Sequence, residues 1–159
     1  MSAATFNTNN TFTLLGNGTK DYLVVEGTSS ADTINASAVS VEVNEAYLTL
    51  NGNGGADVIT GSEFADIING GADADTLRGG NFGDTYIFNT NDVVSGESIF
   101  EASTGLGTDT VSVVTTTDFS TMTAASFDEI EALTFASGQS GTFTGAQLTG
   151  ETIVLTGAG

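Results

Sequence analysis

The chain has 159 residues and carries 20 acidic side chains against two basic ones, which gives a formal net charge of −18. So acidic a chain repels nucleic acid and anionic lipid, because both are bound mainly through Lys and Arg. Its hydrophobic content of 39% predicts a folded protein rather than a disordered acidic one. With neither Cys nor His, a thiolate metal site and a Ser-His or Cys-His nucleophile are excluded.

The first zone of the chain, residues 1–51, is predicted to contain short strands. Its N-terminus has no basic region followed by an apolar run, so no cleavable secretion signal is predicted. In the segment VSVEV, apolar Val alternates with polar residues, which is the period of a half-buried strand. The strands are expected at residues 12–15, 22–25, 39–43 and 47–50.

The second zone, residues 52–88, repeats a nine-residue pattern that reads GNGGADVIT, GSEFADIIN, GGADADTLR and GGNFGDTYI. Position one is always Gly, position six is always Asp, and position eight is Ile, Leu or Tyr. These residues are Gly52, Gly61, Gly70 and Gly79; Asp57, Asp66, Asp75 and Asp84; and Ile59, Ile68, Leu77 and Tyr86. The earlier segment GTSSADTIN, residues 27–35, fits the frame but is out of phase by two, which leaves Asp32 as an open candidate.

The third zone, residues 89–159, is again predicted to be β-structure. Strands are expected at residues 111–116, 130–135, 141–144 and 153–156, and residues 121–133 could hold one or two helical turns. No obvious linker separates the three zones, so one continuous folded unit is expected. No apolar run in the chain approaches the ~20 residues that a membrane helix needs.

A nine-residue period is typical of a solenoid, in which each repeat makes one turn and one short strand. Glycine at position one allows a sharp bend, and the apolar residue at position eight points inward. If successive repeats lie on opposite sides of a flattened coil, Asp57 stacks on Asp75 and Asp66 on Asp84. Stacked strands are ~4.8 Å apart. Two carboxylates at ~5 Å repel by roughly 3 kcal/mol at an effective dielectric constant of 20.

The two basic residues of the chain cannot neutralise such a stack, whereas a divalent cation bound by carboxylates and turn carbonyls can. Ligation by oxygen alone favours calcium, because magnesium demands a tighter octahedral shell and keeps its waters. The alternative is a metal-free solenoid whose Asp residues only cap turns. Four copies in register favour calcium.

The repeats GNGGADVIT and GGADADTLR resemble the G-G-x-G-x-D-x-U-x nonapeptide of the RTX, or hemolysin-type, calcium-binding repeats. The resemblance implies a parallel β-roll that binds calcium between turns two repeats apart, at Asp57 with Asp75 and at Asp66 with Asp84. It also implies ligands from backbone carbonyls near Gly52, Gly54, Gly61, Gly70 and Gly79.

The chain departs from that pattern at position four, where Phe64, Asp73 and Phe82 replace Gly. A bulky residue there could deform a site, whereas Asp73 could add a ligand. The segment GLGTDTVSV, residues 105–113, is similar to the degenerate repeats that follow such arrays, which makes Asp109 a weaker candidate. For Asp73, Glu63 and Asp109, a solvated surface carboxylate is the favoured interpretation.

These patterns predict a calcium-binding extracellular structural protein that folds when it binds calcium. The resemblance implies bacterial type I export, and the open ends of a solenoid predict self-assembly into a filament or surface layer. The alternative is a calcium-dependent folding and secretion module of a larger secreted enzyme, toxin or adhesin. A third hypothesis, a glycan-active β-helix that uses Asp73 and Asp75, has little support, so no enzymatic role is expected.

Overall fold

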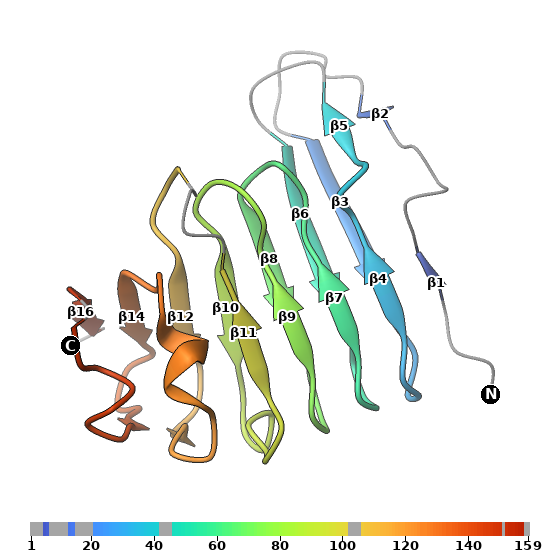
Figure 1. Ribbon diagram of the computed structural model, residues 1–159. Coiled ribbons are helices and arrows are strands. Elements are labelled where there is room, and N and C mark those ends of the chain that lie inside the picture. The colour runs from blue at the N-terminus through green and yellow to red at the C-terminus, as the bar shows by residue number, and fades with distance from the viewer. Residues whose placement is uncertain are drawn as a thin grey trace.

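The computed structural model is an all-β parallel solenoid of about six turns. It describes residues 5–6, 13–14, 21–41, 46–101, 106–150 and 152–157. The chain alternates between two parallel sheets, which form two layers with the core between them (Figure 1). The flanking zones therefore extend the solenoid.

The smaller main sheet has five strands in the order β1 (Thr5–Phe6), β4 (Thr33–Asn35), β7 (Val58–Thr60), β9 (Thr76–Arg78) and β11 (Ser98–Phe100). The larger has seven, in the order β16 (Val154–Gly157), β14 (Ala132–Phe135), β12 (Thr110–Val113), β10 (Thr85–Phe88), β8 (Asp66–Asn69), β6 (Ala46–Asn51) and β3 (Asp21–Glu26). Two short pairs complete the fold, β2 (Thr13–Leu14) with β5 (Ser40–Val41) and β13 (Thr117–Asp118) with β15 (Gly141–Thr142).

Most predicted strands are confirmed, with ends that differ by a few residues. Strands β3, β6, β12, β14, β15 and β16 lie at the predicted intervals, and the predicted helical turn is a 3-10 turn, η1 (Ala124–Phe127). Two predictions reach beyond the described residues, because β2 covers only residues 13–14 of 12–15 and residues 42–45 are not described. Among the described residues, no helix is long and apolar enough to span a membrane.

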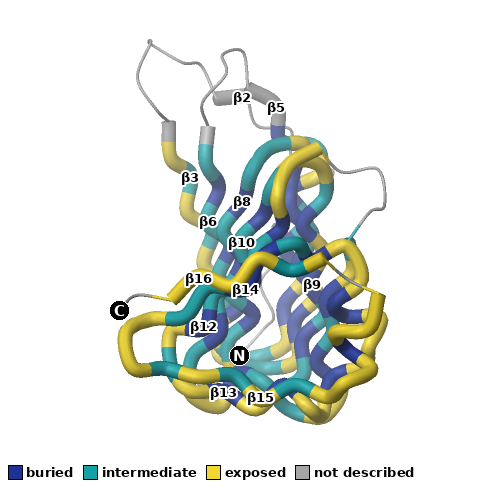
Figure 2. Tube along the Cα trace, turned by 90° about the vertical axis from the view of Figure 1, so that its left-hand side faces the viewer, coloured by how far each residue is buried: buried dark blue, intermediate teal, exposed yellow. Residues whose placement is uncertain are grey.

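The predicted eighteen-residue stacking is confirmed within the nonapeptide array. Ile59 of β7 lies opposite Leu77 of β9, and Ile68 of β8 lies opposite Tyr86 of β10. All four position-eight side chains have 0% exposure, because they face the space between the two sheets. Figure 2 shows this buried interior between the two sheets.

The segment that seemed out of phase belongs to the same stack. Strand β4 pairs with β7 so that Ile34 lies opposite Ile59, 25 residues further on. The additional residues lie between the two strands, in a connection that includes β5. Parallel pairing fixes which residues meet across strands, and it tolerates different connection lengths.

Toward the C-terminus, aromatic rings fill the interior between the sheets. The rings of Phe119 and Phe143 are stacked at 4.8 Å, and Phe88 and Phe127 contact Phe119 edge-on at 5.3 and 5.9 Å. Such pairs contribute about 0.5–1.5 kcal/mol each beyond the area they bury. This cluster packs the larger turns that carry η1, β13 and β15.

Candidate metal centre

A ladder of acidic side chains runs along the turn that precedes the strands of the five-stranded sheet. The backbone N–H of Asp32 donates to Oδ1 of Asp57 at 2.6 Å, and that of Asp57 donates to Oδ1 of Asp75 at 2.7 Å. The N–H of Asp75 in turn donates to Oε2 of Glu97 at 2.9 Å. The predicted pair Asp57 and Asp75 is therefore brought together, within a longer stack.

The seven-stranded sheet carries a second ladder built in the same way. The N–H of Asp66 donates to Oδ1 of Asp84 at 2.8 Å, and that of Asp84 donates to Oδ1 of Asp109 at 2.7 Å. The N–H of Asp109 then donates to Oε2 of Glu131 at 2.7 Å. The pair Asp66 and Asp84 is thus also brought together, and each ladder ends on a glutamate.

Sequence reasoning missed Glu97 and Glu131, and it was wrong about Asp109. Asp109 is only 6% exposed, because it precedes β12 just as Asp84 precedes β10, so it is no solvated surface residue. Glu97 and Glu131 precede Ile99 and Leu133 by two residues, as each array Asp precedes its position-eight residue. An acidic residue two positions before a buried strand residue was the signal that could have found them.

The second carboxylate oxygen separates the turns into two kinds. In Asp57, Asp75 and Asp84 this oxygen, Oδ2, is buried and accepts no hydrogen bond from any residue that the structure describes. In Asp66 it accepts the N–H of Ser62 at 2.5 Å and the Ser62 hydroxyl at 3.0 Å. An unsatisfied buried carboxylate oxygen is costly, so the first kind of turn is suited to a positively charged partner.

The difference follows from the residue at position two. In the turns with an unsatisfied oxygen, Asn53, Gly71 and Gly80 adopt positive φ angles of 75°, 98° and 119°. In the second array repeat Ser62 stands there, and its hydroxyl accepts the N–H of Phe64 at 3.1 Å. Thr28 does the same for Ser30 at 3.2 Å, so these two turns satisfy their own Asp locally.

In two of the three turns whose position four is not glycine, the backbone keeps the conformation that Gly55 has. Asp73 and Phe82 adopt φ angles of 80° and 66°, close to the 95° of Gly55. The Phe82 side chain is 45% exposed and so lies outside the turn interior. Asp73 is exposed as expected, and its Oδ2 accepts the N–H of Gly55 at 3.2 Å.

Each position-one glycine borders a small oxygen-lined space, which we call a cradle. A methyl carbon added to Gly52 would collide with Oδ2 of Asp57 and the carbonyl oxygen of Gly70. One added to Gly61 would meet Oδ2 of Asp66 and the carbonyl oxygen of Gly79. Side-chain and backbone oxygens from stacked repeats thus converge where only glycine leaves room.

Of the remaining predicted glycines, Gly70 and Gly79 border a carboxylate oxygen and Gly54 does not. An added carbon at Gly70 or Gly79 would meet Oδ2 of the Asp in the same repeat, Asp75 or Asp84. At Gly54 the nearest atom outside the adjoining residues would be Cα of Ser29 at 4.0 Å, so this glycine borders no cradle.

Burial raises the pKa of several ladder carboxylates, Asp75 and Glu97 among them. Burial raises the pKa of Asp75 to about 7, although the N–H of Asp57 opposes the shift and the charges of Asp57, Asp73 and Asp92 add to it. Burial likewise raises the pKa of Glu97 to about 8, again opposed by a backbone N–H, that of Asp75. Bringing full negative charge to these positions is therefore unfavourable without a cation.

The donor set of the cradles fits calcium. Calcium takes carboxylate and backbone carbonyl oxygens, and both kinds converge at Gly52 and Gly61. Arg78 is the basic residue in the part of the chain that the structure describes. Its guanidinium lies over the ring of Phe100, 4.6 Å from the ring centroid.

The fold and these turns define a parallel β-solenoid whose repeats stack buried carboxylates in two ladders. More particularly, residues 51–86 match the family model of the RTX calcium-binding nonapeptide repeat, in four copies. This segment is therefore an RTX repeat array, a β-roll module of a kind that binds calcium. Comparisons with curated proteins and with solved structures gave no match to the chain.

Proposed function

We propose that the chain is a calcium-binding extracellular structural protein that folds when its repeat array binds calcium. The observation that carries this proposal is the unsatisfied, fully buried Oδ2 of Asp57, Asp75 and Asp84 within glycine-bordered turns. Asp57 and Asp75 would hold an ion with the carbonyl of Gly70, and Asp66 and Asp84 with that of Gly79. The bound ion supplies the positive charge that the ladders lack.

The proposed coupling of binding to folding follows from the origin of the ligands. The oxygens of one cradle come from repeats stacked 18 residues apart, so they converge only when the strands have paired. In the unfolded chain no such site exists, and the binding free energy therefore becomes folding free energy. Cytosolic calcium is scarce, so the chain would stay unfolded before export and fold outside the cell, where weak extracellular-type sites fill.

A calcium titration followed by circular dichroism tests this proposal. Calcium is expected to raise the β-sheet signal in a saturable way, magnesium at equal concentration much less, and a chelator should reverse the change. The double variant Asp57→Asn with Asp75→Asn should need far more calcium. A matched control, Glu63→Gln with Asp128→Asn, removes two exposed carboxylates and should behave as wild type. A β-sheet signal that is independent of calcium would refute the proposal.

We also propose that copies of the chain assemble end to end, because both edge strands of the described seven-stranded sheet carry exposed apolar side chains. Strand β16 is the edge of the seven-stranded sheet, and its Val154 and Leu155 are 60% and 70% exposed. At the other edge lies β3, where Tyr22 is 70% and Val24 is 55% exposed. Pairing of β16 with β3 of a second copy is heterologous and does not close, so it would build a filament.

Size-exclusion chromatography with light scattering, at several protein concentrations in calcium, tests this assembly, and electron microscopy would show the filament. Leu155→Lys should shift the chain toward monomer. Val58→Lys, which places the same charge at a 43% exposed position of the central strand β7, should leave assembly intact. A monomer at every concentration, with and without calcium, would contradict the idea.

A further inference from the structure

Glu101 occupies the place in the stack where one more repeat would have its glycine. Strand β11 pairs with β9 so that Phe100 lies opposite Arg78, and Gly79 and Glu101 are the residues that follow. Gly79 is in turn stacked beneath Gly61 in the same column, because β7 and β9 pair one turn earlier. Glu101 therefore lies at the end of the glycine column, outside the RTX match at residues 51–86.

The carboxylate of Glu101 faces the last glycine cradle. At Gly52 and Gly61, the oxygens around an added carbon are an Asp Oδ2 and the carbonyl of the next stacked glycine. At Gly79 they are Oδ2 of Asp84 and Oε1 of Glu101. The Glu101 side chain thus supplies the oxygen that a backbone carbonyl supplies in the preceding turns.

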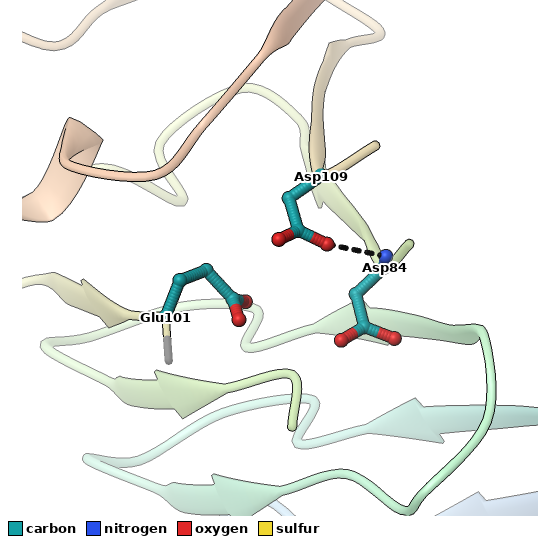
Figure 3. A group of neighbouring side chains, drawn as sticks. All are labelled: Asp84, Glu101 and Asp109. Carbon is teal, nitrogen blue, oxygen red and sulfur yellow. Dashed lines mark hydrogen bonds between the residues drawn. The ribbon is translucent and has the colours of Figure 1, made fainter. Parts of the chain in front are cut away.

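A third carboxylate, that of Asp109, approaches from the next strand. One oxygen of each of Asp84, Glu101 and Asp109 lies within 4.8 Å of the others (Figure 3). Asp84 has 0% exposure, and its Oδ2, beside Glu101 Oε1, accepts no hydrogen bond within the described part of the chain. The cluster therefore contains a fully buried acceptor, Oδ2 of Asp84, which points toward the Glu101 carboxylate.

We propose that Asp84, Glu101 and Asp109 form a second kind of calcium site, which closes the C-terminal end of the repeat array. Three carboxylates are hard oxygen donors. Calcium accepts an irregular arrangement of such donors, whereas magnesium demands a small octahedral shell. The array cradles combine carboxylates with neutral carbonyls, whereas this site has three carboxylates. Because affinity rises with the number of charged ligands, this site fills at lower calcium concentration than the array.

The site rests on the proposed function only in the choice of ion, since Glu101 and Asp109 lie outside the four matched repeats. It gives the array a defined end. An ion held there links β10 and β12 of the seven-stranded sheet to the end of β11 in the five-stranded sheet. Filling this site first would fix the last turn, against which the array turns could then pair.

Equilibrium dialysis with calcium, together with calorimetric titration of the full chain, tests the site. Glu101→Gln keeps the size of the side chain and removes its charge, so it should bind one ion fewer than wild type and lose the tightest binding step. Asp109→Asn keeps an oxygen that can accept the Asp84 N–H, and it should have the same effect. Glu63→Gln makes the same chemical change at an exposed array position and should bind as wild type.

Two results would overturn the site: an unchanged ion count and affinity in Glu101→Gln, or an equal loss in Glu63→Gln. The array variant Asp57→Asn separates this inference from the proposed function. It should weaken the later binding steps and leave the tightest step in place. If wild type binds calcium and only Asp57→Asn reduces the ion count, the proposed function stands and the end site is wrong. If wild type binds no calcium, both are wrong.

Discussion

The backbone N–H of Asp84 donates a hydrogen bond of 2.7 Å to Oδ1 of Asp109, which lies 25 residues further along the chain. The same bond, also 2.7 Å long, joins Asp57 to Asp75 over 18 residues. The two hydrogen bonds have the same length although the chain segments between their partners differ in length. Parallel pairing of the strands that follow sets how the acidic residues stack. The ladder therefore continues beyond the strict nine-residue period.

Alanine at position one should abolish a cradle. Gly52→Ala places a carbon against Oδ2 of Asp57 and the carbonyl of Gly70, neither of which can retreat freely. We expect a loss of stability of about 1–3 kcal/mol in calcium, the usual cost of overpacking, and a higher calcium requirement. Urea unfolding at several calcium concentrations measures the loss of stability and the calcium requirement. Gly145→Ala, where no atom outside the adjoining residues lies within 4 Å of the added carbon, is the matched control; equal effects would argue against the cradle.

The two kinds of turn should differ in their response to loss of charge. Asp57→Asn removes a carboxylate whose Oδ2 accepts no hydrogen bond from the described residues, whereas Oδ2 of Asp66 is satisfied by Ser62. Calcium affinity should therefore fall by about tenfold or more in Asp57→Asn, since substitutions even of residues that only support metal ligands have effects of this size. It should fall by less in Asp66→Asn. The midpoint of a calcium titration measures this. A larger effect in Asp66→Asn would contradict the assignment.

The Glu97 carboxylate stabilises the fold through a hydrogen bond and destabilises it through a buried charge. Two substitutions distinguish these two effects. In Glu97→Gln the amide oxygen can still accept the N–H of Asp75, while the buried charge is removed. The calcium-free chain should therefore become more stable at pH 9, above the raised pKa of about 8. Glu97→Ala leaves the N–H unsatisfied and should cost about 1–3 kcal/mol. Folding of the chain by added sucrose in chelator, with the free energy extrapolated to zero sucrose, measures both effects. Destabilisation by Glu97→Gln would be inconsistent with this balance.

Acid should partly replace calcium in folding the chain. Burial raises the pKa of Asp84 from 3.8 to about 9, with the charges of Asp66, Glu101 and Asp109 adding to it and the N–H of Asp66 opposing it. The folded state therefore binds this proton more tightly than the unfolded state. The resulting stability is complete below about pH 4 and is lost as the pH rises toward 9.

In chelator, the chain should accordingly need less added sucrose to fold at pH 5 than at pH 8, because its free energy of unfolding is higher at pH 5. In saturating calcium the difference should shrink or reverse, because protons and calcium compete for the same carboxylates. A calcium-free chain whose stability increases from pH 5 to pH 8 would show that the ladder charges do not control folding.

The zone boundaries at residues 51 and 88 stay a prediction. The ladder residues of the array could be predicted from the sequence, whereas Glu97 and Glu131 were missed. The array was readable because Gly at position one, Asp at position six and an apolar residue at position eight recur within nine residues. Glu97 and Glu131 escaped because they carry Glu in place of Asp and follow connections of irregular length. Their place in the ladders depends on strands that pair 22 residues apart.

The sequence by itself determined the coil, its inward side chains and the stacking of Asp57 on Asp75 and of Asp66 on Asp84. Those features follow from turn chemistry and hydrophobic period, which act between near neighbours in the chain. Only the tertiary structure decided which carboxylate oxygens lack a hydrogen bond among the described residues, and that Glu101 meets Asp84. Both depend on strand pairing across connections of unequal length, which no local pattern encodes.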